Sequence, residues 1–309
     1  MDPQLPPDLV LRRDALTGGW SDGELATRLR RGDLVRLRPG AYLVDPSSPD
    51  AAARHRHLVT ATLASLRRPA VVSHQSAAVL WGLPLWGAPL GRVHVSRRPP
   101  ASSEVGRFLR CHVLRLPDDD VTSLDGVAVT TPARTLLDLA LTLPAEPAVV
   151  ALDGALRLGR VRPEDLRGLL DAVGPVPGSR RAARAIGFAD GRSESVGESR
   201  SRVVLHRLAL PAPELQVPVC RPDGSLIGRC DFGWDDVRTV GEFDGRVKYG
   251  RLLRPGQTAG DAVYEEKLRE DDLRDAGREV VRWTWADVST PAVIAQRLLR
   301  AFHRGRRRA

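Results

Sequence analysis

Residues 226–245 read LIGRCDFGWDDVRTVGEFDG, and this stretch decides the fold expected for the last third of the chain. Residues 226–232 and 239–243 are short segments rich in apolar, β-branched and aromatic side chains, which is typical of β-strands. The pair Asp235-Asp236 makes a turn between them. We therefore expect two antiparallel strands that lie side by side.

The sequence on both sides extends this pattern. Residues 215–220 form a further strand, and the Pro-Asp-Gly sequence at 222–224 turns the chain into the strand that follows. A helix precedes these strands at residues 195–208. A second helix at 265–274 leads to a last strand at 280–285. The expected order is α-β-β-β-α-β, in a domain of residues 186–309 that ends in a basic tail.

Acidic side chains gather on the central strands. Strand pairing brings Asp231 close to Glu242, and Asp244 shares a face with Glu242 because it lies two residues further on. Glu198 can approach from the preceding helix. Carboxylates that converge repel one another unless a cation lies between them. Oxygen ligands suit Mg²⁺ or Mn²⁺, so we predict a metal site with Asp231, Glu242 and Glu198 as ligands.

Such a metal site can hydrolyse a phosphodiester, because the ion polarises a phosphoryl oxygen and helps to form hydroxide. A basic side chain nearby would offset the developing negative charge. The candidates for this basic group are Lys248, Lys267 and Arg269. In the alternative interpretation, Asp231 and Glu242 are solvated residues on the wet face of an antiparallel sheet. Glu198 would then only stabilise the dipole of its helix.

Three segments carry a resemblance to a known family: Glu198-Ser199-Arg200, Arg229-Cys230-Asp231-Phe232 and Gly241-Glu242-Phe243-Asp244-Gly245. In this order they resemble the PD-(D/E)xK nucleases, and among them the endonuclease domains related to very-short-patch repair enzymes. The resemblance implies a restriction-endonuclease-like fold. It makes Asp231 and Glu242 metal ligands, and Glu198 an auxiliary ligand or a residue that positions water.

The sequence departs from this family's pattern at Asp244, where the family has lysine. The basic catalytic group would then come from Lys248 or Lys267. Asp244 would be a further metal ligand or a hydrogen-bond acceptor that orders the loop.

The first segment, residues 1–48, has the pattern of two helices and a hairpin. We expect a helix at residues 9–16, and a second helix that Ser21 and Glu24 begin with a capping box. Residues 34–44 form the hairpin. This order predicts a winged helix-turn-helix that places a helix in the major groove of DNA and a wing on phosphate. The arginines expected to contact DNA are Arg28, Arg30, Arg31, Arg36 and Arg38. A dimerisation or packing module is the alternative.

The second segment, residues 49–185, has a mixed α/β pattern. His74 lies at a helix start, and Asp138 and Asp153 lie in helices with apolar neighbours. Polar residues in such places cap helices or make buried hydrogen bonds, so we expect structural roles for all three. No catalytic residue is predicted in this segment.

Four stretches of these two segments carry a second resemblance: LVRLRPGAY at 34–42, SHQSAA at 73–78, WGLP at 81–84 and TTPARTLLDL at 130–139. They resemble the antitoxin-like proteins of abortive-infection, or type IV toxin–antitoxin, systems. The resemblance covers the first half of the chain. It implies a DNA-binding regulatory module and a toxin partner.

The chain has 309 residues with 47 lysines and arginines against 38 acidic residues, so its net charge is +9. This balance favours a polyanionic partner such as nucleic acid, although GC-rich coding also enriches arginine. The three cysteines show no metal-binding spacing, which fits a reducing compartment. No signal-peptide pattern and no run of 18 apolar residues is evident, so we expect a cytoplasmic protein without a membrane span.

Two functions remain open on the sequence. In the first, the N-terminal module positions the chain on DNA and the C-terminal site cuts the DNA with Mg²⁺ or Mn²⁺. In the second, the chain is an antitoxin-like transcriptional regulator whose nuclease-like domain binds nucleic acid without cleaving it. RNA is an alternative substrate for the first function.

Overall fold

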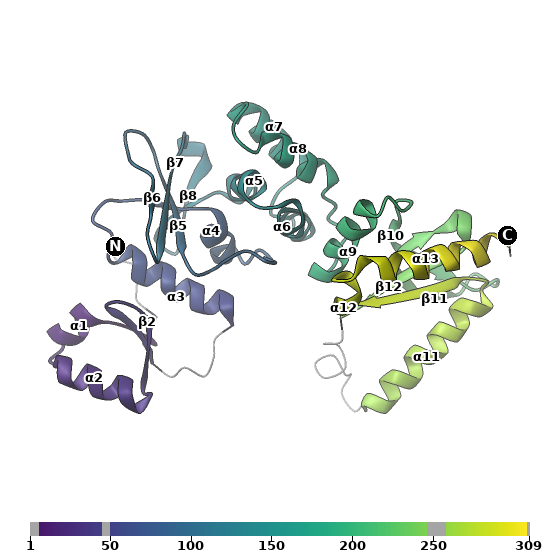
Figure 1. The fold of residues 1–309 in the computed structure, drawn as a ribbon, viewed down its shortest axis with the longest axis horizontal. Coiled ribbons are helices and arrows are strands. Elements are labelled where there is room, and N and C mark those ends of the chain that lie inside the picture. The colour runs from purple at the N-terminus through teal and green to yellow at the C-terminus, as the bar shows by residue number, and fades with distance from the viewer. Residues whose placement is uncertain (1–5, 45–49, 246–257, 308–309) are drawn as a thin grey trace. The chain divides into compact units, whose positions relative to one another are not determined.

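The computed structural model describes residues 6–44, 50–245 and 258–307. They form two compact units, Met1–Phe188 and Ala189–Ala309 (Figure 1). The boundary between the units lies three residues beyond the predicted boundary at 185/186. The predicted boundary at 48/49 lies outside the described residues, and both segments that it separates belong to unit 1.

Unit 1 begins with two helices and a three-stranded sheet. Its first elements are β1 (Leu9–Leu11), α1 (Arg12–Thr17), α2 (Asp22–Arg31), β2 (Leu34–Arg38) and β3 (Ala41–Val44). The strands lie in the order β1-β3-β2, and both pairs are antiparallel. The predicted capping box begins α2: Ser21 Oγ accepts a hydrogen bond from the backbone N of Glu24 at 3.2 Å, and the Glu24 carboxylate accepts one from the backbone N of Ser21 at 2.7 Å. The predicted hairpin is β2 and β3.

The helix expected over residues 9–16 is wrong at its start, because Leu9–Leu11 forms strand β1. Leu9 and Leu11 are buried in one apolar cluster with Leu43, whereas Val10 packs against a second cluster. Side chains that alternate between the two faces of the backbone are typical of a strand. This alternation decides the conformation of residues 9–11, although the residues that follow have a helical pattern.

The rest of unit 1 is a mixed sheet packed with helices, as its sequence pattern predicts. Its elements are α3 (Ala51–Leu63), β4 (Val71–Val72), α4 (His74–Leu80), β5 (Val93–Arg97), β6 (Glu104–Val105), β7 (Leu109–Val113), η1 (Asp118–Asp120), β8 (Val121–Leu124), β9 (Val127–Thr130), α5 (Pro132–Thr142), α6 (Ala145–Arg157), α7 (Pro163–Val173) and α8 (Ser179–Phe188). The six strands lie in the order β6-β7-β5-β4-β9-β8, with parallel and antiparallel neighbours. Helices α4 to α8 pack against one another.

One apolar core joins the N-terminal sheet of unit 1 to the larger sheet. Leu37 and Leu43 of the small sheet belong to the same buried cluster as Val59 of α3 and as Val72 and Val95 of the large sheet. A polar contact reinforces this junction, since Arg13 Nη1 donates to the backbone carbonyl of Ala64 at 3.0 Å. The two predicted N-terminal segments therefore share part of their core.

Unit 2 has the predicted order of elements. They are α9 (Val196–Arg207), β10 (Glu214–Cys220), β11 (Leu226–Trp234), η2 (Asp235–Val237), β12 (Thr239–Asp244), α11 (Ala259–Asp275), β13 (Glu279–Thr284), α12 (Trp285–Val288) and α13 (Pro291–Arg306). The strands lie in the order β10-β11-β12-β13, where β13 runs parallel to β12 and the other pairs are antiparallel. Parallel neighbours such as β12 and β13 need a long crossover connection, which is usually helical, and α11 belongs to this connection.

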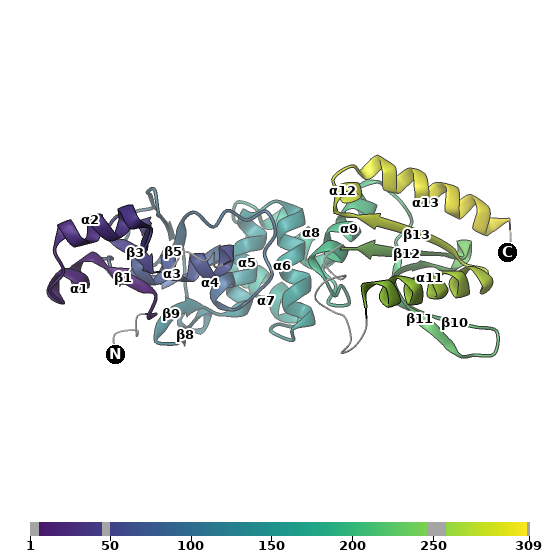
Figure 2. The same cartoon turned by 90° about the horizontal axis from the view of Figure 1, so that it is seen from below.

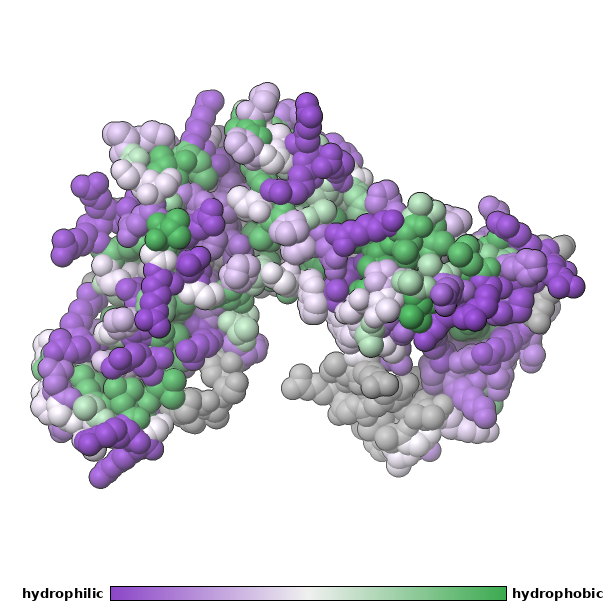
Figure 3. Space-filling model, viewed as in Figure 1, coloured by the Kyte–Doolittle hydropathy of each residue, from purple (hydrophilic) through white to green (hydrophobic). Residues whose placement is uncertain are grey.

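Helices cover both faces of this sheet (Figure 2). Leu205 of α9 and Leu298 of α13 are buried with Phe232 and Trp283 in the main cluster. Leu273 of α11 is buried with Val240 in a smaller cluster. Helix α11 presents a hydrophilic outer surface (Figure 3), as its charged sequence requires. None of the helices within the described ranges combines the length and the apolar character that crossing a bilayer requires.

The predicted basic tail is largely part of α13, which extends to Arg306. Arg304 Nε donates to a carboxylate oxygen of Glu279 at 2.8 Å, so this arginine is tied to the start of β13. Residues 308–309 lie outside the described residues.

At Gly305, α13 packs directly against the backbone of η2. A Cβ atom at Gly305 would lie 1.9 Å from the carbonyl oxygen of Val237. We predict that Gly305→Ala destabilises unit 2 by about 1–3 kcal/mol, because the helix must move away from the sheet. Urea unfolding followed by hydrogen–deuterium exchange of peptides from β12 and α13 measures this change separately from unit 1.

The matched control is Gly260→Ala in α11, where a Cβ would meet its nearest neighbour, Thr258 Oγ1, at 3.6 Å. We expect its stability to remain within about 1 kcal/mol of the wild type. Equal stability of the two variants would contradict the close packing of α13.

Candidate functional site

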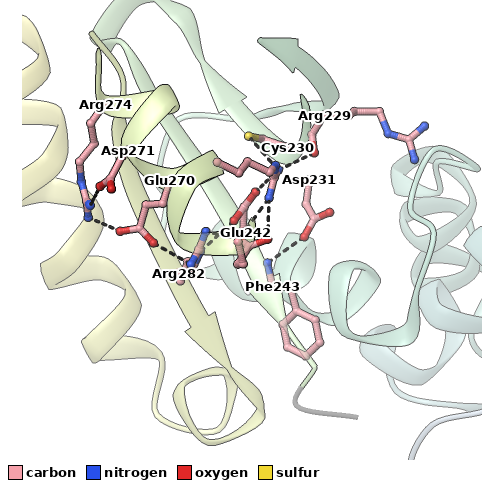
Figure 4. A network of polar contacts seen from close by, with 11 residues as sticks. Arg229, Cys230, Asp231, Glu242, Phe243, Glu270, Asp271, Arg274 and Arg282 are labelled. Carbon is pink, nitrogen blue, oxygen red and sulfur yellow. Dashed lines mark hydrogen bonds and ion pairs between the residues drawn. The ribbon is translucent and has the colours of Figure 1, made fainter. Parts of the chain in front are cut away.

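Asp231 and Glu242 lie side by side at the centre of unit 2, as predicted. Phe232 of β11 pairs with Gly241 of β12, so the next positions in this antiparallel register, Asp231 and Glu242, lie opposite each other. Asp231 Oδ2 accepts a hydrogen bond from the backbone N of Phe243 at 2.8 Å (Figure 4). The carboxylate of Asp231 thereby binds the backbone of β12 next to Glu242.

Two arginines hold the carboxylate of Glu242. Arg282 Nε, from the parallel neighbour β13, donates to Glu242 Oε2 at 2.8 Å. The Arg269 guanidinium, from α11, donates to Glu242 Oε1. Glu242 is only 9% exposed, so these charges meet where water contributes little.

Two glutamates of α11 extend this network. Arg282 Nη1 lies 2.7 Å from Glu270 Oε2 (Figure 4). Arg269 Nη1 donates to Glu266 Oε1 at 3.3 Å. Burial opposes the charge of each arginine, but the attraction of Glu242 and its neighbours outweighs burial and raises the pKa of Arg269 and of Arg282. The negative charge of Glu242 is therefore compensated by side chains of the protein itself.

Glu198 caps its own helix. Its carboxylate accepts hydrogen bonds from the Ser195 hydroxyl at 2.7 Å, the Glu194 backbone N at 2.9 Å and the Gln216 amide at 2.8 Å. Across the described ranges, Glu198, Asp231 and Glu242 do not form a group whose ligand atoms all lie within 4.8 Å of one another. The structure brings the first predicted acidic pair together and places Glu198 at the start of α9.

The predicted basic groups differ in their positions. Arg269 contacts Glu242, whereas Lys267 is exposed on α11 and Lys248 lies outside the described residues. Asp244 is the half-buried last residue of β12. Sequence reasoning missed Arg282, although a charged residue in the apolar stretch EVVRWT was a signal that it needs a partner.

In unit 1, arginines line a surface pocket of about 700 Å³ beside α3 and β7. These arginines are Arg38, Arg67, Arg68, Arg97 and Arg107. Arg38 reaches it by donating to Thr62 Oγ1 at 2.7 Å, and burial lowers the pKa of Arg38. Of the two predicted DNA contacts on the hairpin, Arg38 therefore points toward α3.

The other predicted DNA contacts lie at the surface of the N-terminal part. Arg28 stacks over the ring of Trp20, with its guanidinium carbon 4.2 Å from the ring centroid. Arg30, Arg31 and Arg36 are exposed. These three side chains can reach a ligand from the surface of the protein without a change in the core.

Three histidines converge inside unit 1. His74 begins α4, His94 lies in β5 and His112 lies in β7. His94 Nδ1 lies 3.0 Å from His112 Nε2, and the rings of His74 and His112 stack with their centroids 3.7 Å apart. No sequence pattern predicted this cluster, because its members are far apart in the chain and each strand carries a single histidine of it.

Burial is the main influence on the charge of this cluster. It lowers the pKa of His74, His94 and His112 to about 3 each, so all three rings are neutral near pH 7. Asp138 lies close by, and burial raises its pKa to about 6 even though Arg134 Nε donates to it at 2.9 Å. Asp138 thus makes a buried ion pair, and Asp153 is also buried.

Comparison with known proteins gives one family match. Residues 40–187 match the family described as AbiEi antitoxin C-terminal domain. This match supports the antitoxin-like interpretation of the first half of the chain. It leaves the nuclease-like interpretation of unit 2 without support.

Two relatives and one solved structure are similar to the chain. The uncharacterized proteins MT2308 and Rv2248, from two strains of Mycobacterium tuberculosis, are each 29% identical to it over 92% of this chain and 97% of their own length. The crystal structure of the RV2827C protein from Mycobacterium tuberculosis is 20% identical, covers 59% of this chain and 72% of its own, and has a TM-score of 0.38. Such a TM-score supports no conclusion about fold or function.

The histidine cluster predicts an acid-sensitive unit 1. The folded pKa of each histidine is about 3, below its ordinary 6.5, so its stabilising contribution is present above about pH 6.5 and is lost as the pH falls toward 3. Asp138 has a folded pKa raised to about 6, so its own contribution makes unit 1 more stable as the pH falls. The three histidines oppose this single group, so the net change is a loss of stability. Denaturant unfolding in a chelating buffer at about pH 7 and about pH 4.5 measures the decrease in stability.

The variants His94→Gln and His112→Gln are expected to lose less stability between the two pH values than the wild type. His303→Gln, at an exposed histidine of α13, is the control and is expected to lose as much as the wild type. An equal decrease in all four proteins would contradict a role of the cluster in acid sensitivity.

Proposed function

We propose that the chain is a DNA-binding regulator of the antitoxin type, in which unit 1 carries the DNA contacts. The observation that carries this proposal is the surface pocket lined by Arg38, Arg67, Arg68, Arg97 and Arg107. Five arginines on one surface suit the phosphate groups of nucleic acid, because guanidinium groups bind phosphate through two hydrogen bonds. The family match over residues 40–187 supports the same function.

The N-terminal elements would supply the base contacts. We infer a winged helix-turn-helix in which α2 enters the major groove and the hairpin of β2 and β3 touches the backbone. Arg30 and Arg31 on α2 and Arg36 on the hairpin are exposed and available for this purpose. Arg38 links this module to the pocket through Thr62, so one protein surface would serve both. A toxin partner and a location in the cytoplasm are parts of the same proposal.

Arginines that neutralise phosphate predict a salt-dependent affinity. We expect Arg67→Ala and Arg36→Ala each to weaken duplex DNA binding and to reduce the slope of log affinity against log salt by about 0.9 for each phosphate that the variant no longer binds. Fluorescence anisotropy at several salt concentrations measures this slope. The control is Arg160→Ala, which removes an exposed arginine outside the pocket. Unchanged slopes in both test variants would contradict the proposed surface.

A second candidate function is DNA cleavage by unit 2. The order α9-β10-β11-β12-α11-β13 and the contact of Asp231 with the strand of Glu242 favour it. In this proposal, Asp231 and Glu242 would hold Mg²⁺ or Mn²⁺, which polarises the phosphate and activates water. Glu198 would be an auxiliary ligand or would position water, and Lys248, Lys267 or Arg269 would offset the developing negative charge. The two arginines on Glu242 oppose it, because a metal ion would have to displace them.

We therefore expect unit 2 not to cut nucleic acid. Plasmid, single-stranded and mismatched DNA, and RNA, are incubated with the full chain and Mg²⁺ or Mn²⁺, and the products are separated on gels. No metal-dependent product is the expected result. Cleavage that is abolished in Asp231→Ala and Glu242→Ala, but kept in the exposed control Asp236→Ala, would establish the nuclease instead.

A further inference from the structure

The three histidines of unit 1 have the arrangement of a metal-binding site. One nitrogen atom from each of His74, His94 and His112 can be chosen so that all three lie within 4.8 Å of one another, and no other group of three histidine, cysteine or acidic side chains in the described ranges meets this condition. We propose that these histidines bind one divalent transition-metal ion of the zinc class. The site does not include the acidic residues of unit 2.

The backbone places two of the ligands on one face of the sheet. Strands β5 and β7 are parallel neighbours, and Ser96 pairs with His112. His94 lies two residues from Ser96, so its side chain points to the same side as that of Ser96. The rings of His94 and His112 consequently meet above the sheet.

The third ligand is held in an unusual backbone conformation. His74 has a φ of 51°, in the left-handed region that residues other than glycine adopt rarely. Such a conformation persists only where the surroundings fix it, and it is concentrated at binding and catalytic sites. Here it directs a fully buried imidazole onto the ring of His112.

The chemistry of the ligands selects the ion. Three imidazole nitrogens suit Zn²⁺, Co²⁺, Ni²⁺ or Cu²⁺, whereas Mg²⁺ and Ca²⁺ require oxygen ligands. Tetrahedral zinc with bonds of about 2.0–2.1 Å places two ligand nitrogens about 3.3 Å apart. His94 Nδ1 and His112 Nε2 are 3.0 Å apart, close to this separation. The rings of His74 and His112 stack, so one of them must turn its nitrogen edge toward the ion before both can bind it. Burial keeps the rings neutral, and the neutral ring is the form that binds metal.

A second layer of polar groups orients His74. Ser73 Oγ lies 2.9 Å from His74 Nδ1 and accepts a hydrogen bond from the Ser96 hydroxyl at 2.7 Å. Asp138 Oδ2 is 3.9 Å from the same nitrogen and has no hydrogen-bond partner among the described residues, although the side chain is 2% exposed. Metal-bound histidines commonly donate their second N–H to a hydroxyl or carboxylate in this way, which leaves His74 Nε2 for the ion.

A pocket of about 730 Å³ gives access to the cluster. His94 and His112 line it together with Gln75, whose Oε1 is buried and has no hydrogen-bond partner in the described part of the chain. Three protein ligands leave a tetrahedral ion one open position, which would face this pocket and hold water. Arg92, Arg107 and Arg110 also line the pocket and favour an anion there.

The experiment uses the full-length chain without an affinity tag, stripped of metal with a chelator. Cobalt(II) is titrated in and followed by its visible absorption bands, and zinc is then added as a competitor. We expect one cobalt ion per chain, the intense bands of four-coordinate rather than octahedral cobalt, and displacement by zinc. Zinc binding is also expected to raise the unfolding temperature, because the ion binds only the folded state.

The ligands are tested by His94→Gln and His112→Gln. Each is expected to reduce zinc affinity more than about 100-fold, beyond the effect typical of second-layer groups. His303→Gln, at an exposed histidine of unit 2, is the matched control and is expected to bind like the wild type. Circular dichroism at neutral pH checks that each variant is folded.

Two outcomes would overturn the proposal. One is the absence of saturable cobalt or zinc binding to the wild-type chain, which would make the cluster a hydrogen-bonded structural feature only. The other is unchanged affinity in both folded test variants. Because metal binding is the readout, neither outcome depends on whether the chain binds DNA.

Discussion

A buried charged side chain needs an oppositely charged partner, and each unit is built around one cluster of such buried ion pairs. In unit 1, Arg134 of α5 is 3% exposed and lies between Asp138 of the same helix and Asp120 of η1, at 2.9 and 2.6 Å. In unit 2, Glu242 of β12 lies between Arg282 of β13 and Arg269 of α11. The first cluster ties α5 to η1. The second ties α11 to strands β12 and β13.

Local patterns predicted most of the elements, since hydrophobic period and turn chemistry act over a few residues. The strands at residues 226–232 and 239–243 and the capping box at Ser21 and Glu24 are found in the structure. Strand β1 was missed because three residues are too few to show a period before a helical pattern begins. The core shared by the small and large sheets of unit 1 depends on long-range packing, such as that of Leu43 in one cluster with Val95, which no local pattern reveals.

Local patterns also failed to predict the parts of the candidate sites that depend on long-range packing. The pairing of neighbouring strands predicted that Asp231 and Glu242 are close, because a short turn fixes which strands meet. The partners of Glu242 come from 27 and 40 residues further along the chain, so their approach depends on the packing of α11 and β13. The histidine cluster joins α4, β5 and β7. It requires the sheet order and the backbone of His74, and neither can be read from spacing in the sequence.

The arginines on Glu242 bear directly on the two candidate functions. Hydrogen bonds between charged groups contribute about 1.5–3 kcal/mol each, and a metal ion at Glu242 would have to replace two of them. Mg²⁺ binds weakly to a few carboxylates because it gives up its water reluctantly. Without substrate, the exchange therefore favours the arginines. Phosphate groups of bound nucleic acid would free Glu242 for a metal ion only if they bound Arg269 and Arg282 in its place. For cleavage, phosphate would have to replace Glu242 as the partner of these arginines. If Glu242 keeps the arginines, unit 2 has no metal site at this carboxylate.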